Sequence, residues 1–140
     1  MNDIELSKSL VAEQAAETVR LADAIWGYAE LAYGEEKSAS ALIDALKKEG
    51  FAIEEGIAGM PTAFTATYRV GSGKPTVGFL AEYDALSGLS QCAATPECEP
   101  VVQGGAGHGC GHNLLCSGRA ATRRRWRSRN TSSGRKRTAP

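Results

Sequence analysis

The sequence lacks any apolar stretch long enough to span a membrane or to form the core of a signal peptide. Its N-terminal stretch, MNDIELSKSLVAEQAAETV, is acidic and amphipathic instead. We therefore expect no membrane contact and a cytoplasmic location, in which the four cysteines are thiols rather than disulfides. Hydrophobic residues make up 42% and charged residues 23% of the 140 residues, which excludes a wholly disordered or collagen-like chain.

Acidic residues are absent from the C-terminal part of the chain. Residues 1–116 hold all 16 acidic and 7 basic residues, a net charge of −9, whereas residues 117–140 hold 9 basic residues, a net charge of +9. Three interpretations of this basic segment stay open: an arm that binds nucleic acid or another anionic surface, a solvated disordered tail, and a segment translated out of frame. The third has a simple origin, because alanine and glycine codons read one base out of step give arginine codons.

Two helices are expected in the first third of the sequence. The spacing of apolar residues predicts a helix over residues 4–33 that ends at Gly34. Its buried face is expected to consist of residues spaced by four and three: Val11, Ala15, Val19, Ala22, Trp26 and Ala29. A second helix is predicted over residues 36–48, with lysines in its last turn and Gly50 after it.

Two strands are expected after these helices. Apolar and polar residues alternate over residues 63–70, the pattern of a half-buried strand. Residues 76–81, TVGFLA, form a short apolar run between Pro75 and Glu82, which is typical of a strand covered on both faces. Helices followed by strands predict a layered fold of the α/β or α+β class.

A long loop precedes a glycine-rich motif. Residues 86–107 are rich in Ser, Gly, Pro and Ala and lead into GAGHGCGHNLL, residues 105–115. In an extended segment the side chains of His108, Cys110 and His112 would face the same way, and imidazole and thiolate are good zinc ligands. The alternative is a glycine-rich turn in which these side chains only pack or form hydrogen bonds.

Two carboxylates follow the apolar run directly, in the sequence Glu82-Tyr83-Asp84. Functional groups often gather at the carboxyl ends of strands, where a carboxylate can bind a metal or fix the tautomer of a metal-binding histidine. Taken alone, the pair is better explained as two polar residues that cap the strand end and face water.

Taken together, GFLAEYDALSGLSQ and GHGCGHNLL resemble the N-terminal part of the metal-dependent amidohydrolases of peptidase family M-twenty. Within this family, the resemblance favours the branch that contains the p-aminobenzoyl-glutamate hydrolases, and it covers about residues 15–115. It implies an α/β, zinc-exopeptidase-like catalytic domain with helices packed on a mixed β-sheet. It also implies zinc or manganese, a glutamate general base, a small amide substrate (p-aminobenzoyl-glutamate, an acyl-amino acid or a dipeptide) and a homodimer formed by a separate domain.

The resemblance also assigns roles to individual residues. Cys110 and His112 match metal ligands, and Asp84 matches an aspartate that orients the metal centre. The chain departs from the wider family at two positions. Glu82 stands where distant relatives have a histidine ligand, and Asn113 stands where many members have an aspartate, so neither is assigned to the metal.

The remaining candidates receive no ligand role. His108 corresponds to a neighbour of the metal centre, and Cys92, Cys98 and Cys116 correspond to no ligand. The family's glutamate base and its other ligands lie beyond the Cys-Gly-His segment, whereas residues 117–140 contain no Glu, Asp, His or Cys. We therefore expect residues 1–116 to be the N-terminal part of a truncated catalytic domain, inactive alone, followed by a disordered basic tail at 117–140. The rival hypothesis is a small zinc- or nucleic-acid-binding protein with a genuine basic tail; under the family hypothesis nucleic acid is not an expected partner.

Overall fold

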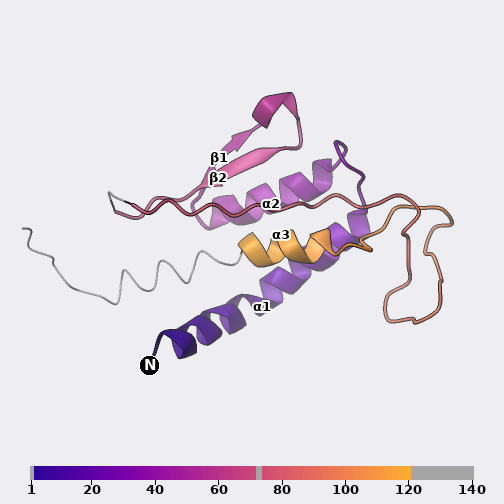
Figure 1. The fold of residues 1–140 in the computed structure, drawn as a ribbon, viewed down its shortest axis with the longest axis horizontal. Helices are drawn as coiled ribbons and strands as arrows, with labels where there is room; N and C mark the ends of the chain where they lie inside the picture. The colour runs from indigo at the N-terminus through magenta and orange to yellow at the C-terminus, as the bar shows by residue number, and fades with distance from the viewer. Residues whose placement is uncertain (1, 72–73, 121–140) are drawn as a thin grey trace, which may run out of the picture.

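Three helices and one two-stranded sheet make up the regular structure of the chain in its computed structural model, which describes residues 2–71 and 74–120 (Figure 1). In chain order the elements are α1 (Asp3–Tyr28), α2 (Glu36–Lys48), β1 (Ala52–Glu55), the short 3-10 helix η1 (Ile57–Gly59), β2 (Phe64–Thr67) and α3 (His112–Ala120). Both α2 and α3 pack against α1, and the sheet packs on α2. The expected α/β class is confirmed.

Helix α1 begins as its sequence predicts and ends earlier than expected. The Asn2 side chain accepts hydrogen bonds from the backbone N–H groups of Ile4 and Glu5, and the Glu5 carboxylate accepts one from the Asn2 N–H, a complete capping box. The helix stops at Tyr28 because Ala29 adopts a left-handed conformation with φ of 46°. The predicted end at Gly34 is therefore wrong. No helix among the described residues has both the length and the apolar character needed to cross a bilayer.

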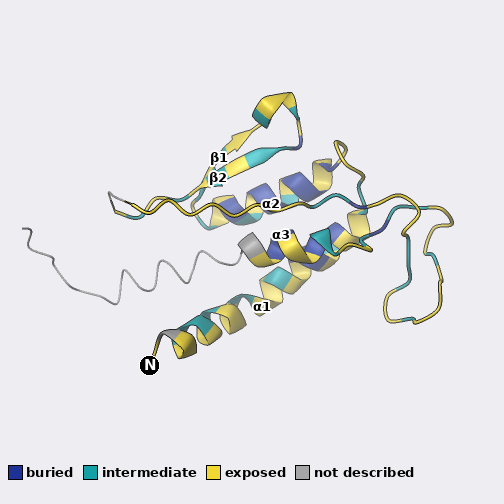
Figure 2. Cartoon of the chain, viewed as in Figure 1, coloured by how far each residue is buried: buried dark blue, intermediate teal, exposed yellow. Residues whose placement is uncertain are grey.

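The buried face of α1 differs from the predicted one. Leu21, Ala22 and Ile25 are buried, whereas Val11 and Val19 are 70% and 57% exposed. Figure 2 shows the N-terminal half of α1 mostly exposed, and the buried residues of this helix all lie in its C-terminal half. Of the six residues predicted to be buried, only Ala22 is buried. The other two buried residues, Leu21 and Ile25, each lie one position before a predicted residue, so the buried face is rotated by about one residue from the predicted one.

Helix α2 and the hairpin agree more closely with the sequence. The predicted helix over residues 36–48 is confirmed, and its buried side carries Ala39, Leu42, Ile43 and Leu46. Strand β2 confirms the centre of the strand predicted over 63–70 and pairs antiparallel with β1, with Ile53 opposite Ala66. The small core is formed by Leu21, Ile25, Leu42 and Cys116, with Phe64 and Tyr83 packed against it.

The second predicted strand is not formed. Residues 76–81 run as an extended segment that belongs to no sheet in the described part of the chain, and all six are exposed. The expectation of a strand covered on both faces, within a mixed sheet, is therefore wrong for these residues. The sequence carries strand character there, but a strand needs neighbouring strands, and the described residues provide none on either side.

Helix α3 crosses the boundary predicted between an ordered part and a tail. It runs from His112 to Ala120, and Ser117 is buried, with its hydroxyl donating to the carbonyl of Asn113 at 2.8 Å. Residues 117–120 are thus helical rather than part of a tail. The predictions for residues 121–140 lie outside the described residues.

Candidate metal centre

One histidine and two carboxylates meet where the chain enters α3. His112 Nδ1 lies 2.8 Å from Asp84 Oδ1 and 3.1 Å from the Asp84 carbonyl oxygen, and His112 Nε2 lies 3.2 Å from Glu82 Oε2. The His112 side chain is only 15% exposed, whereas that of Glu82 is 69% exposed. The cluster is therefore anchored inside the fold at its Asp84 end and open to solvent at its Glu82 end.

Backbone pairing brings these residues together from segments 28 positions apart in the sequence. The Ala85 N–H donates to the Glu30 carbonyl at 2.7 Å, and Leu86 and Gly107 exchange two hydrogen bonds of 3.0 Å each. Gly107 allows the close approach, because a Cβ at that position would collide with the backbone of Leu89. The two ends of the 86–107 loop are thereby fixed next to each other, directly beside the site.

The surroundings of His112 determine its tautomer. Both groups near Nδ1 are oxygen acceptors from Asp84, so Nδ1 carries a hydrogen and donates it. In the neutral ring Nε2 then has a free lone pair, which faces the carboxylate of Glu82. Nε2, the atom that would bind a metal, therefore lies against a carboxylate oxygen.

His108 does not join this cluster. Its Nε2 lies 3.0 Å from the carbonyl oxygen of Ile25 in α1 and donates to it, and its Nδ1 is buried without a hydrogen-bond partner among the described residues. Burial lowers the pKa of His108 below its ordinary value, which keeps the ring neutral. Of the two geometries left open for residues 108–112, the structure shows the glycine-rich turn rather than the extended segment, because the Gly111 N–H donates to the His108 carbonyl and α3 begins at His112.

The four cysteines occupy unlike environments. Cys110 and Cys98 are exposed, and Cys92 is half-buried. Cys116 is buried in the core, where burial raises the pKa of its thiol to about 11, so it stays protonated. Within residues 2–71 and 74–120, no three His, Cys, Asp or Glu side chains form a group that could hold a metal ion. The ligand roles of Cys110 and His112 and the orienting role of Asp84 therefore stay predictions.

A buried polar chain that no sequence pattern predicted supports the site from the side of the hairpin. Tyr83, between the two carboxylates, donates from its hydroxyl to the carbonyl of Thr62, while the Thr62 hydroxyl donates to Glu35 Oε2 at 2.8 Å. The Tyr83 ring packs against Phe64 of β2, with 6.0 Å between ring centroids. Burial raises the pKa of Tyr83 to about 12, which keeps the hydroxyl a donor. The sequence signal that could have indicated this role is the position of an aromatic residue between two acids, directly after an apolar run.

Comparison with known proteins agrees with this arrangement of residues. The chain is 45% identical over 95 residues to a subunit of the p-aminobenzoyl-glutamate hydrolase of Escherichia coli strain K12, a match that covers 68% of this chain and 19% of that protein. It is 34% identical over 135 residues to the human Xaa-Arg dipeptidase, covering 86% of this chain and 27% of the relative. The mouse Xaa-Arg dipeptidase is 33% identical over 125 residues, a match that covers 81% of this chain and 25% of the relative. The chain belongs to the M-twenty family of amidohydrolases.

The match to this family is to an N-terminal region only. The chain spans between about a fifth and about a quarter of the length of the curated relatives it matches. No family model matches the chain. The names of these M-twenty relatives denote hydrolases of amide bonds, which agrees with the amidohydrolase assignment.

Proposed function

We propose that this chain carries part of the metal centre of an amidohydrolase. The observation that carries the proposal is the 2.8 Å contact between His112 Nδ1 and Asp84 Oδ1. Metal-binding histidines commonly donate their other ring N–H to a carboxylate, which fixes the tautomer and strengthens the ligand. His112 has this partner, and its Nε2 points to the open side of the cluster, next to Glu82.

The donor chemistry fits a divalent ion such as zinc or manganese. Imidazole from His112 and the exposed thiol of Cys110 would hold it, and Asp84 would keep the imidazole oriented. A bound ion supplies Lewis acidity, which polarises an amide carbonyl and acidifies an attacking water. A hydrolytic zinc site uses about three protein ligands, and Cys110 and His112 provide two of them.

The proposed substrate is a small molecule with an amide bond, such as p-aminobenzoyl-glutamate, an acyl-amino acid or a dipeptide. Support comes from the relatives, whose names specify p-aminobenzoyl-glutamate and Xaa-Arg dipeptides. We propose a cytoplasmic location and, for the intact relative, a homodimer. We further propose that this chain alone is inactive, because residues 117–140 contain no carboxylate to serve as the base.

Zinc titration of the 140-residue chain tests the metal centre. Cys110→Ser and His112→Ala should each lower zinc affinity at least about tenfold. Cys98→Ser is the matched control, because Cys98 is also an exposed thiol but lies in the loop. Affinity should fall as the pH is lowered, since both donors must lose protons to bind. If zinc binding depends on Cys98 and Cys92 and is insensitive to Cys110 and His112, the assignment is wrong.

An activity assay and the gene sequence test the rest of the proposal. The purified chain should show no hydrolysis of p-aminobenzoyl-glutamate or acyl-amino acids; turnover that chelators abolish would contradict this. The DNA after the Leu115 codon can also be read in the other two frames. A small-residue helix followed by a Glu-Glu pair in one of them would support an out-of-frame origin of the basic segment.

The rival function, a small zinc- or nucleic-acid-binding protein, receives no support from a described residue. Cys116 is a core residue with a raised pKa, which disfavours a four-cysteine zinc site. The zinc titration decides between the two functions, because a structural zinc site would depend on Cys92 and Cys98.

A further inference from the structure

Tyr83 lies between the two carboxylates of the candidate metal centre, but its contacts are elsewhere. Glu82 and Asp84 both contact His112, at 3.2 Å and 2.8 Å. The Tyr83 ring packs against the core, with its centroid 6.0 Å from that of Phe64 in β2. The three side chains thus alternate, as in an extended segment. In such a segment the direction of the middle side chain sets the direction of the two beside it.

Both the ring and the hydroxyl of Tyr83 are held by the fold. The hydroxyl donates to the backbone carbonyl of Thr62, in the connection between β1 and β2. Burial raises the pKa of Tyr83 to about 12, so the hydroxyl keeps the proton that it donates. Packing against Phe64 needs only the ring, because a phenylalanine would fill the same space. The hydroxyl therefore adds a second fixed point, which sets how the ring and the backbone behind it are oriented.

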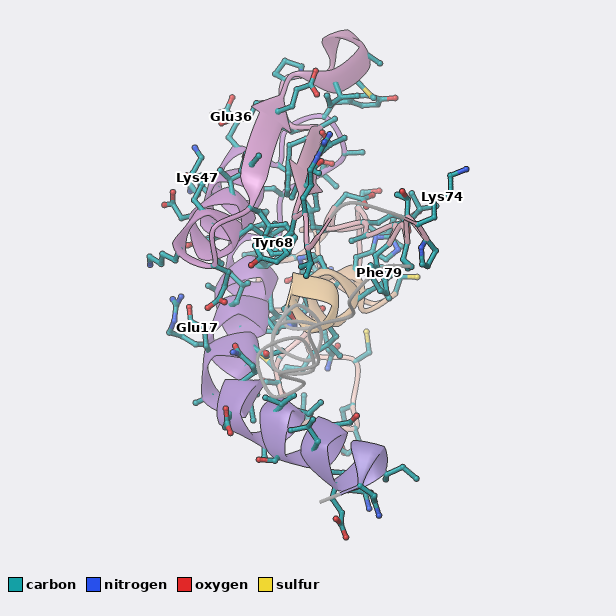
Figure 3. All side chains as sticks on the ribbon, turned by 90° about the vertical axis from the view of Figure 1, so that its left-hand side faces the viewer. Glu17, Glu36, Lys47, Tyr68, Lys74 and Phe79 are labelled. Carbon is teal, nitrogen blue, oxygen red and sulfur yellow. The ribbon has the colours of Figure 1, made fainter. Side chains whose placement is uncertain are left out.

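Thr62 is itself fixed by a buried contact to the start of α2. It is 8% exposed, and its hydroxyl donates at 2.8 Å to Oε2 of Glu35, which is 9% exposed and directly precedes α2. The next carbonyl along the chain, that of Ala63, accepts a hydrogen bond of 2.9 Å from the Gly56 N–H. Figure 3 shows the hairpin turn at the same end of the molecule as Glu36, the first residue of α2. The acceptor of the Tyr83 hydroxyl is therefore held from both α2 and the hairpin.

Asp84 lies between two points at which the chain is attached to the fold. On its N-terminal side, the Tyr83 hydroxyl is bonded to Thr62. On its C-terminal side, the N–H of the buried Ala85 donates to the Glu30 carbonyl at 2.7 Å. The position of the Asp84 carboxylate therefore depends on both attachments.

We propose that Tyr83, bonded to Thr62, is a positioning residue of the metal centre. It holds Asp84 so that the carboxylate stays against the His112 ring, and it touches neither the ion nor a substrate. The contact between Thr62 and Glu35 belongs to the same device, because it fixes the carbonyl to which Tyr83 is bonded. The effect of Tyr83 on zinc rests on the metal centre proposed above, whereas its effect on the His112 ring requires no metal.

Zinc titration of the full chain measures the positioning effect. Tyr83→Phe removes the hydroxyl and keeps the ring, so Asp84 is held less firmly. Zinc affinity should fall about three- to tenfold, less than on loss of a direct partner of the ligand. Tyr33→Phe is the matched control and should leave zinc affinity unchanged, because Tyr33 is 74% exposed and lies outside the site. Circular dichroism checks that both variants keep the helix content of the parent.

The His112 ring gives a readout that is specific to its orientation. The chain has two histidines, so His112→Ala assigns the ring signals of both by elimination. Proton–nitrogen NMR of the metal-free parent should show a His112 Nδ1–H proton that its bond to Asp84 protects from exchange with water. In Tyr83→Phe this proton should exchange about threefold faster or more, whereas in Tyr33→Phe its exchange should be unchanged.

Thr62 offers a pair of variants that tests the same chain of hydrogen bonds. Thr62→Val removes the hydroxyl that donates to Glu35 and keeps the shape of the side chain, so zinc affinity should fall as in Tyr83→Phe. Thr62→Ser keeps the hydroxyl and loses a methyl group, and its zinc affinity should stay within about twofold of the parent. Because both variants change the same buried side chain, the contrast separates the hydrogen bond from packing.

Three results would overturn the proposal. In the first, Tyr83→Phe binds zinc like the parent and leaves the exchange of the His112 Nδ1–H unchanged, while His112→Ala loses zinc affinity; the metal centre then stands without this device. In the second, Thr62→Ser loses as much affinity as Thr62→Val. In the third, the effects of Tyr83→Phe accompany a loss of helix content.

A failure of the metal centre itself gives a different result. His112→Ala would then leave zinc affinity unchanged. In that case the exchange of the His112 Nδ1–H in the metal-free parent and in Tyr83→Phe alone decides whether Tyr83 positions Asp84.

Discussion

Asp84 and His112 form the closest side-chain contact of the candidate metal centre, 2.8 Å between Oδ1 and Nδ1. Asp84 is held by backbone pairing of its neighbour Ala85 to Glu30, and His112 by its place at the start of α3. The contact therefore joins two segments that are positioned independently by the fold. Its consequence for His112 is a fixed ring and a fixed tautomer, with Nε2 directed toward Glu82.

The Asp84–His112 contact should set zinc affinity. Asp84→Asn keeps the size of the side chain but removes its charge, so His112 becomes a weaker and less well-oriented ligand. We expect zinc affinity to fall about 10–100-fold. Asp44→Asn, the same change at an exposed position of α2, should leave zinc affinity unchanged. Equal affinities for Asp84→Asn and the parent would show that Asp84 does not orient the ligand.

Glu30 should make the stability of the chain depend on acid pH. Its carboxylate accepts hydrogen bonds from the Lys37 N–H, the Ser38 N–H and the Ser38 hydroxyl at the start of α2. Partial burial raises the pKa of Glu30, but these hydrogen bonds outweigh it and leave the pKa below its ordinary value of 4.5. The stabilisation is thus fully present above this value and is lost as the pH falls through the lowered pKa.

Glu30→Gln measures that contribution. At about pH 7 the variant should be less stable than the parent by about 1 kcal/mol, as for the loss of a helix cap. The difference should shrink when urea unfolding is repeated at an acid pH below the lowered pKa of Glu30, where the parent carboxyl is protonated as well. A difference that is the same at both pH values would mean that the charge of Glu30 is not what stabilises the start of α2.

The buried face of α1 can be tested with one pair of variants. Ile25→Ala removes a fully buried side chain from the core and should lower the free energy of unfolding by about 2–5 kcal/mol. Val19→Ala removes a side chain that is 57% exposed and should change it by less than about 0.5 kcal/mol. A larger loss of unfolding free energy for Val19→Ala than for Ile25→Ala would instead support the buried face that the sequence predicted.

Gly107 should not tolerate a side chain. Gly107→Ala places a Cβ against the backbone of Leu89 and should destabilise the chain by about 2–3 kcal/mol, measured by thermal or urea unfolding. Gly118→Ala is the control, because that glycine lies in α3 with open space around it. The control should stabilise the chain by about 0.5–1 kcal/mol, as expected for alanine in a helix. Equal effects of the two substitutions would contradict the close approach at Gly107.

The sequence alone determined features that depend on local patterns. Helix α2 agrees with its predicted bounds because apolar spacing, terminal lysines and a following glycine all act within a few residues. The centre of β2 follows from the alternation of apolar and polar residues in the same way. The motif residues Asp84, Cys110 and His112 were identified from their order in the chain, and family membership followed from the same motifs.

Only the tertiary structure decided features that depend on distant parts of the chain. The buried face of α1 and the direction of His108 are set by contacts with α2, α3 and the Ile25 carbonyl, which no local pattern encodes. The TVGFLA segment also shows that a local pattern is not sufficient. Its residues favour a strand, but a strand forms only when a neighbouring strand pairs with it, and the described residues provide none. Local periodicity therefore identified where structure can form, whereas packing between remote segments selected which faces are buried and which groups meet at the site.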